Sequence, residues 1–166
     1  MQGRIAKISK GLPHYTHLLT KQSALEAVKN NRDLIQRSDY EAALRVAVEE
    51  KSQTLGKIYT KATYSSKANI FAEVLLACAL ATDEKGFFSA KDVREPLRAI
   101  TKKQYNIQAY IRHLNQFSQE SRGPILKKEG QMLRFQYSFV EPMMQPYALM
   151  KGLTEGLISE DQLGVL

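Results

Sequence analysis

Amide and guanidinium side chains recur every fourth residue between positions 107 and 118. Gln108, Arg112 and Gln116 each step about 40° round a helix from the previous one, so they form one ridge. The opposite side of that helix is apolar and comprises Ile107, Tyr110, Ile111, Leu114 and Phe117. Amide and guanidinium groups are the donors that read base edges in the major groove of DNA. The spacing therefore predicts a helix with its polar ridge turned toward DNA.

Basic side chains flank this segment on both sides. They are Lys102, Lys103, Lys127, Lys128 and Arg134. The last three lie within residues 125–139, where apolar and polar residues alternate around a Glu-Gly pair, a pattern that predicts a β-hairpin. Lysine and arginine on such a hairpin neutralise phosphates. Two alternatives remain open: a surface that docks a protein partner, and a polar face that is merely solvated.

Residue patterns for catalysis or metal binding are sparse. The chain has neither the GxxxxGK[ST] nor the GxGxxG pattern of phosphate-binding loops. His14 and His17 lie three residues apart, but no further cysteine, histidine or carboxylate cluster completes a zinc site. Cys78, the only cysteine, lies in the apolar run VLLACALA, which favours a buried core residue over a reactive thiol. We expect no catalytic residue and no metal site in this chain.

The first 64 residues are expected to form a helical unit. One helix is predicted between residues 12 and 31, with Pro13 in its first turn. A longer helix is predicted from about 39 to 62, with Gly56 as its weak point. Ser38 and Glu41 have the spacing of a capping box at its start. The polar stretch 63–69 is predicted to join this unit to the next.

Residues 65–142 are predicted to form a second unit with a different pattern. It begins with a helix over 70–82 and a very short strand at Phe87-Phe88. A helix opened by Ser89 and Asp92 follows, and Pro96 is expected to kink it. The third helix is the one with the polar ridge, and the hairpin comes last. This order of elements is that of a winged helix-turn-helix, so the predicted fold is mainly α with a small β-hairpin wing.

Residues 143–166 are called the tail here, and their pattern predicts a helix with a frayed end. Its methionines and leucines are expected either to pack on the second unit or to dock a partner. Residues 141–166 carry an excess of three negative charges, whereas residues 1–66 and 67–140 each carry an excess of five positive charges. A basic excess of this kind favours an anionic partner, and nucleic acid is the usual one.

The segment IAKISKGLPHYTHLLTKQSALEAVKNNRDLIQRSDYEAAL resembles the helical lid that follows the nucleotide-binding core of bacterial AAA-plus ATPases. It is most similar to the origin-recognition and transposition-helper branch. The matching positions are Gly11, Leu12, Pro13, Ile35, Asp39 and either Ala42 or Ala43. The family's sensor-2 arginine, a permanently charged residue that can bind phosphate through two hydrogen bonds, is replaced here by His14. A winged helix follows the lid in origin-recognition ATPases, so the resemblance covers roughly residues 4–140.

This resemblance implies a non-catalytic C-terminal part of a longer ATPase. The longer protein would bind ATP and magnesium through a core that precedes this chain, and His14 would be its weak sensor-2-like contact to nucleotide. The alternative for His14 is a polar residue at a helix start without any nucleotide contact. The expected partners are DNA and the upstream ATPase core, with a protein partner or a homo-oligomer as further possibilities. No apolar run reaches the roughly 18 residues of a membrane span, and the lone cysteine fits a reducing cytoplasm.

Overall fold

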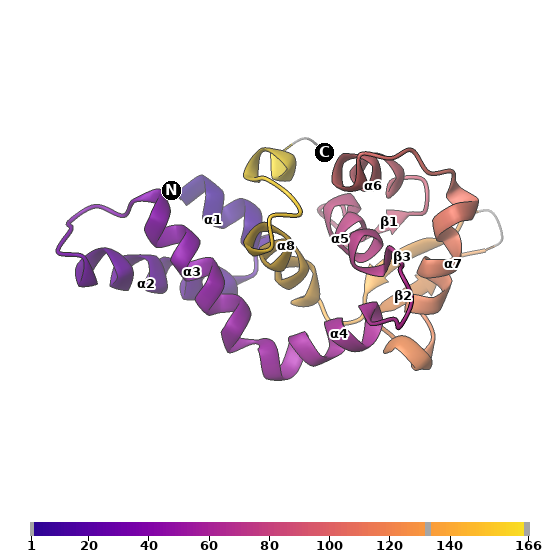
Figure 1. Cartoon of the computed structure of the whole chain (residues 1–166), viewed down its shortest axis with the longest axis horizontal. Helices are drawn as coiled ribbons and strands as arrows, with labels where there is room; N and C mark the ends of the chain where they lie inside the picture. Colours follow the sequence, from indigo (N-terminus) through magenta and orange to yellow (C-terminus); the bar gives the residue numbers. More distant parts are fainter. Residues whose placement is uncertain (1, 132–133, 165–166) are drawn as a thin grey trace.

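The computed structural model describes residues 2–131 and 134–164 and is mainly helical, with one small antiparallel sheet (Figure 1). The α-helices are α1 (Gln2–Ser9), α2 (Pro13–Lys29), α3 (Arg37–Glu50), α4 (Lys57–Thr63), α5 (Phe71–Ala81), α6 (Arg94–Thr101), α7 (Ile107–Phe117) and α8 (Met144–Thr154). The strands are β1 (Phe88–Ser89), β2 (Leu126–Glu129) and β3 (Gln136–Phe139). Short turns of other helix types are η1 (Ser52–Gly56), η2 (Glu120–Arg122) and η3 (Glu160–Gly164). None of the helices in this described part is long and apolar enough to cross a membrane.

The start of α3 is capped by different residues from those predicted. The helix begins at Arg37, and the carboxylate of Asp39 accepts a hydrogen bond from the Gln36 amide at 2.8 Å. The predicted Ser38–Glu41 capping box is therefore wrong. Asp39 is 2% exposed because Arg32 pairs with its other carboxylate oxygen. This buried ion pair fixes Asp39 in the first turn and places the cap two residues earlier than the pattern suggested.

The long helix predicted over 39–62 is divided into two. Helix α3 ends at Glu50, the π-helical turn η1 follows, and α4 begins at Lys57. Gly56 lies at the junction, where an added Cβ would come 3.0 Å from the Tyr147 hydroxyl of α8. The glycine therefore allows α8 to approach the chain closely at the point where the helical ladder is interrupted.

The second half of the chain follows the predicted order of elements. The strands are arranged β1-β3-β2, with Phe88 and Lys128 opposite Tyr137 on its two sides. The expected kink at Pro96 is absent, because α6 begins only at Arg94 and the proline falls in its first turn. A backbone N–H is not needed there for the helical ladder. The carboxylate of Asp92 does accept hydrogen bonds from Ser89, but it closes a turn before the helix.

Helix α8 packs inside the molecule. It lies in the middle of the structure, in contact with α1, α3 and α5 (Figure 1). Its buried residues are Met144, Gln145, Pro146, Tyr147, Ala148, Leu149, Met150 and Gly152. The amide of Gln145 donates to the Ala79 carbonyl of α5 at 3.0 Å, and the Tyr15 hydroxyl of α2 donates to the Met143 carbonyl at 3.3 Å. Of the two expectations for the tail, the structure shows packing within the chain for α8, but against α1 and α3 of the first unit as well as α5 of the second.

The stretch 64–70 contains neither helix nor strand, and Tyr64 is 70% exposed. Arg122 contacts residues at both ends of this linker. Its Nη1 atom donates to the Ala62 and Tyr64 carbonyls at 2.7 and 2.9 Å, and its guanidinium lies 3.6 Å from the centre of the Phe71 ring. One arginine from η2 therefore restrains both flanks of the linker.

We expect chymotrypsin to cut first after Tyr64, because an exposed segment outside helices and strands is the preferred site of proteolysis. Replacing Arg122 by alanine should speed this cut severalfold, because alanine can neither donate to the two carbonyls nor cover the Phe71 ring. Fragment masses followed over time measure the effect, with Arg134→Ala as the control for removal of an exposed arginine. First cleavage inside α7, or equal rates for the two variants, would contradict the expectation.

Candidate nucleic-acid interface

The N-terminus of helix α7 is capped by a side chain. The side chain of Asn106 accepts a hydrogen bond from the Ala109 amide at 2.9 Å. The buried residues of α7 are Tyr110, His113, Leu114 and Phe117. Ile107 and Ile111, which belong to the apolar side identified in the sequence, are only half-buried because they lie at the edges of the buried face. The Tyr110 hydroxyl donates to the Ala90 carbonyl at 2.7 Å, which ties α7 to the turn before α6.

The polar ridge of α7 is largely open to solvent. Gln108 and Arg112 are exposed, whereas Gln116 is half-buried near the end of the helix. Arg112 forms no ion pair with any residue that the structure describes. Its guanidinium group is therefore available to an anion or to a base edge.

His113 lies on the buried face beside this ridge, a role that the sequence pattern alone did not assign to it. It is 3% exposed, and its ring meets that of Phe71 edge-on with 4.6 Å between centroids. Burial lowers the pKa of His113, and the nearby Arg112 and Arg122 lower it further. The environment of the imidazole therefore favours its neutral form, and the ring packs on the buried face of α7. The sequence does indicate this burial, because His113 comes three residues after Tyr110 and four before Phe117 and so shares a helix face with both.

The hairpin β2–β3 carries the predicted basic residues. Lys127, Lys128 and Arg134 are all exposed. Lys128 is nevertheless held in place, because its ammonium donates to the Asn115 side chain of α7 at 2.9 Å and lies 4.1 Å from the centre of the Phe135 ring. Lys128 therefore fixes the hairpin against α7, whereas Lys127 and Arg134 have no ion-pair partner among the described residues. Asn115 and Phe135 are parts of this arrangement that the sequence pattern did not single out.

The turn after β2 requires glycine. Gly130 has a φ of 101°, and a Cβ at this position would lie 2.5 Å from the Arg134 carbonyl oxygen. The closeness of the two backbones and the left-handed conformation both exclude a side chain. Strand β2 ends at Glu129, directly before this glycine, and β3 begins at Gln136.

His14 is not part of this interface. It lies exposed in the first turn of α2, with its ring edge-on to Tyr15 at 5.5 Å between centroids. Helix α2 belongs to the opposite half of the molecule from α7 (Figure 1). Cys78 is fully buried in α5, and burial raises the pKa of its thiol. Within residues 2–131 and 134–164, no group of three or more histidine, cysteine, aspartate or glutamate side chains is placed to hold a metal ion.

No protein-family model matches the chain, and neither a curated protein nor a solved structure matches it. The candidate interface is therefore inferred from the geometry of α7 and the hairpin alone.

Proposed function

We propose that this chain binds duplex DNA, with α5, β1, α6, α7 and the hairpin β2–β3 acting as a winged helix. The observation that carries the proposal is the exposed ridge of Gln108 and Arg112 beside a hairpin that exposes Lys127 and Arg134. The helix pair α6–α7 between β1 and the hairpin, together with the strand order β1-β3-β2, supports the same interpretation. In such a domain the ridge lies in the major groove and the hairpin contacts the DNA backbone.

We further propose that the chain is the non-catalytic C-terminal region of a cytoplasmic AAA-plus-type ATPase. This part of the proposal rests on the lid-like segment from residue 5 to residue 44 and on its position before the winged helix. The residues present do not make an ATP site by themselves, because His14 is a lone, exposed side chain in the first turn of α2. ATP and magnesium would be held by a core outside this chain, with His14 facing the nucleotide at most weakly.

Fluorescence anisotropy of a labelled duplex tests the DNA proposal. The purified chain should bind at about 50 mM salt and lose affinity steeply toward about 200 mM, because contacts to phosphate release counterions. Binding that is absent at low salt, or that does not respond to salt, would contradict a phosphate-contacting interface.

Replacing Arg112 by alanine should cost roughly 1–3 kcal/mol in binding free energy and relax sequence preference. Lys127→Ala should weaken binding evenly across sequences and reduce the salt slope by about 1. Lys21→Ala, at an exposed position on α2, is the matched control and should change nothing. If both interface variants bind as the control does, α7 and the hairpin are not the contact surface.

The alternative is a nucleotide-responsive protein-docking module without DNA contact. The buried α8 does not support it, because its apolar residues are used inside the molecule. The observation in its favour is a set of exposed apolar side chains at and after the end of α2: Leu25, Val28 and Leu34. If this alternative holds, Val28→Asp should abolish binding of the protein partner while Arg112→Ala leaves it intact.

A further inference from the structure

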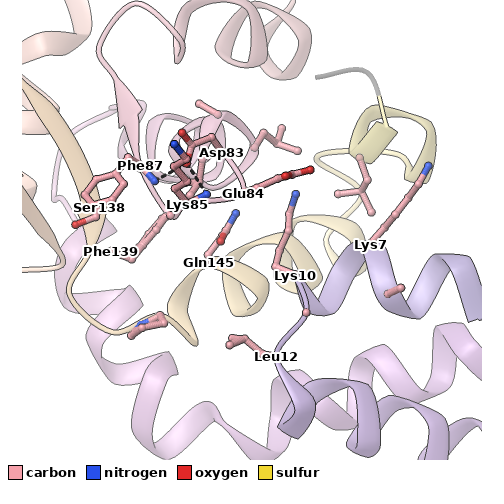
Figure 2. Close-up of a pocket in the computed structure, with 18 of the residues that line it drawn as sticks. Lys7, Lys10, Leu12, Asp83, Glu84, Lys85, Phe87, Ser138, Phe139 and Gln145 are labelled. Atoms are coloured by element: carbon pink, nitrogen blue, oxygen red, sulfur yellow. Dashed lines mark hydrogen bonds between the residues drawn. The ribbon is translucent and has the colours of Figure 1, made fainter.

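A groove of about 880 Å³ lies where the helical N-terminal half meets α8 and the turn after α5 (Figure 2). Four separate parts of the chain line it: residues 6–12, residues 80–87, residues 138–145 and residues 162–163. Its volume lies within the range of roughly 300–1,000 Å³ that small-molecule sites occupy. Junctions between packed units are also the preferred location of such sites.

The walls of the groove are partly apolar. The apolar side chains come from all four parts and include Leu12, Leu80, Phe87, Phe139 and Leu163. Phe139 is 8% exposed and Leu80 is 6% exposed, so each presents only a small surface to the groove while its bulk belongs to the core. An apolar body of a ligand would therefore find a fixed surface rather than mobile side chains.

The charged groups of the groove leave positive charge uncompensated. Lys7 and Lys10 reach it from α1 and the turn after α1, and no carboxylate of the described residues pairs with either. The groove walls remove part of the hydration of the Lys10 ammonium, which lowers its pKa although the side chain still meets solvent. Asp83 accepts hydrogen bonds from the Lys85 and Phe87 amides at 2.9 Å each, so its carboxylate is held within its own turn. Glu84 and Lys85 also line the groove, so its charged side chains are three lysines and two carboxylates, an excess of one positive charge.

A buried amide supplies a directional contact. Gln145 is 9% exposed, and its nitrogen donates to the Ala79 carbonyl. This bond fixes the side chain, whose carbonyl oxygen accepts no hydrogen bond from the described residues. Figure 2 shows Gln145 and Lys10 both directed into the groove, from α8 and from the turn after α1. A ligand thus meets an ammonium, a fixed acceptor and an apolar wall within one space.

We propose that this groove binds a small amphipathic anion, a phosphate or carboxylate group carried on an apolar body. The anionic group lies at Lys10 and Lys7, the body lies against Phe87 and Phe139, and a donor on the ligand meets the Gln145 oxygen. The proposal does not depend on DNA binding, because no groove residue belongs to α7 or to the exposed part of the hairpin.

Amide chemical shifts of the isotope-labelled chain test it, with phenyl phosphate as the probe. Phenyl phosphate should shift the amides of residues 10–12 and 83–87 in a saturable way. Inorganic phosphate and benzyl alcohol, which carry only the anion or only the ring, should bind severalfold more weakly. Shifts confined to other parts of the chain, or equal binding of benzyl alcohol, would overturn the proposal.

The variant Lys10→Asn tests whether the Lys10 ammonium binds the anionic group. Residue 10 has a φ of 50°, a left-handed backbone that asparagine tolerates better than lysine, so the variant should fold normally. It should weaken phenyl phosphate roughly tenfold, the loss of one charged hydrogen bond. Lys21→Asn is the control, and Glu84→Gln should leave binding equal or tighter. Equal affinities of the two lysine variants, or weaker binding by Glu84→Gln alone, would show that no anion occupies the groove.

Discussion

Replacing Leu149 by aspartate should prevent the chain from folding. Leu149 is fully buried in α8, in the helix that packs on α1, α3 and α5. Removing the leucine side chain from a core costs about 2–5 kcal/mol. Placing a carboxylate there without a partner adds several kcal/mol. The sum is comparable with the whole stability of a small domain, about 5–15 kcal/mol. Circular dichroism and urea denaturation of the purified variant measure the loss of stability.

Leu34→Asp is the matched control, because it makes the same substitution at a position that is 79% exposed. Its stability should stay within about 0.5 kcal/mol of the original chain. A Leu149→Asp protein that unfolds at the same urea concentration as the control would show that α8 is not part of the core. If Leu149→Asp fails to bind a protein partner, we expect the cause to be unfolding and not damage to a docking surface.

Asp39→Ala should lower the free energy of unfolding by roughly 3 kcal/mol, at the lower end of what breaking a buried ion pair costs. The substitution removes the partner of Arg32 and the acceptor for the Gln36 amide at the start of α3. Arg32 is 24% exposed, so water compensates in part for the missing carboxylate. Chemical denaturation followed by circular dichroism gives the difference directly.

Two further variants separate the causes of this destabilisation. Asp39→Asn keeps an acceptor for the Gln36 amide but removes the charge, so its stability should lie between those of the original chain and Asp39→Ala. Asp33→Ala, at an exposed position six residues earlier, should be neutral within about 0.5 kcal/mol. If Asp39→Ala were as stable as Asp33→Ala, the ion pair and the cap would contribute nothing measurable.

The sequence predicts those helices whose apolar residues recur at helical spacing. It does not predict the features that depend on contacts between residues far apart in the chain. Helices α2, α5 and α7 lie where the period of apolar residues places them. Helix α1 was not predicted, because its only buried apolar residues in eight positions are Ile5 and Ile8. The break after Glu50 lies where Tyr147, a residue far along the chain, comes close to Gly56. Local patterns contain no information about such a contact.

The candidate interface was easier to predict than the groove. Gln108 and Arg112 share one helix face, so their exposure follows from angular spacing alone. Lys128 was selected for its charge, but its bond to Asn115 depends on how the hairpin folds back on α7. The groove joins Lys10, Asp83 and Gln145 from three remote segments, and only the packed structure brings them to one place.

The central position of α8 also governs when the chain can finish folding during its synthesis. Translation proceeds from the N-terminus, so every helix that α8 covers leaves the ribosome before residues 144–154 do. Until then, the apolar surfaces of α3 and α5 that α8 covers have no partner and are exposed to chaperones and proteases. A chain whose translation stalls before residue 144 is therefore expected to be degraded rather than to accumulate as two separately folded halves.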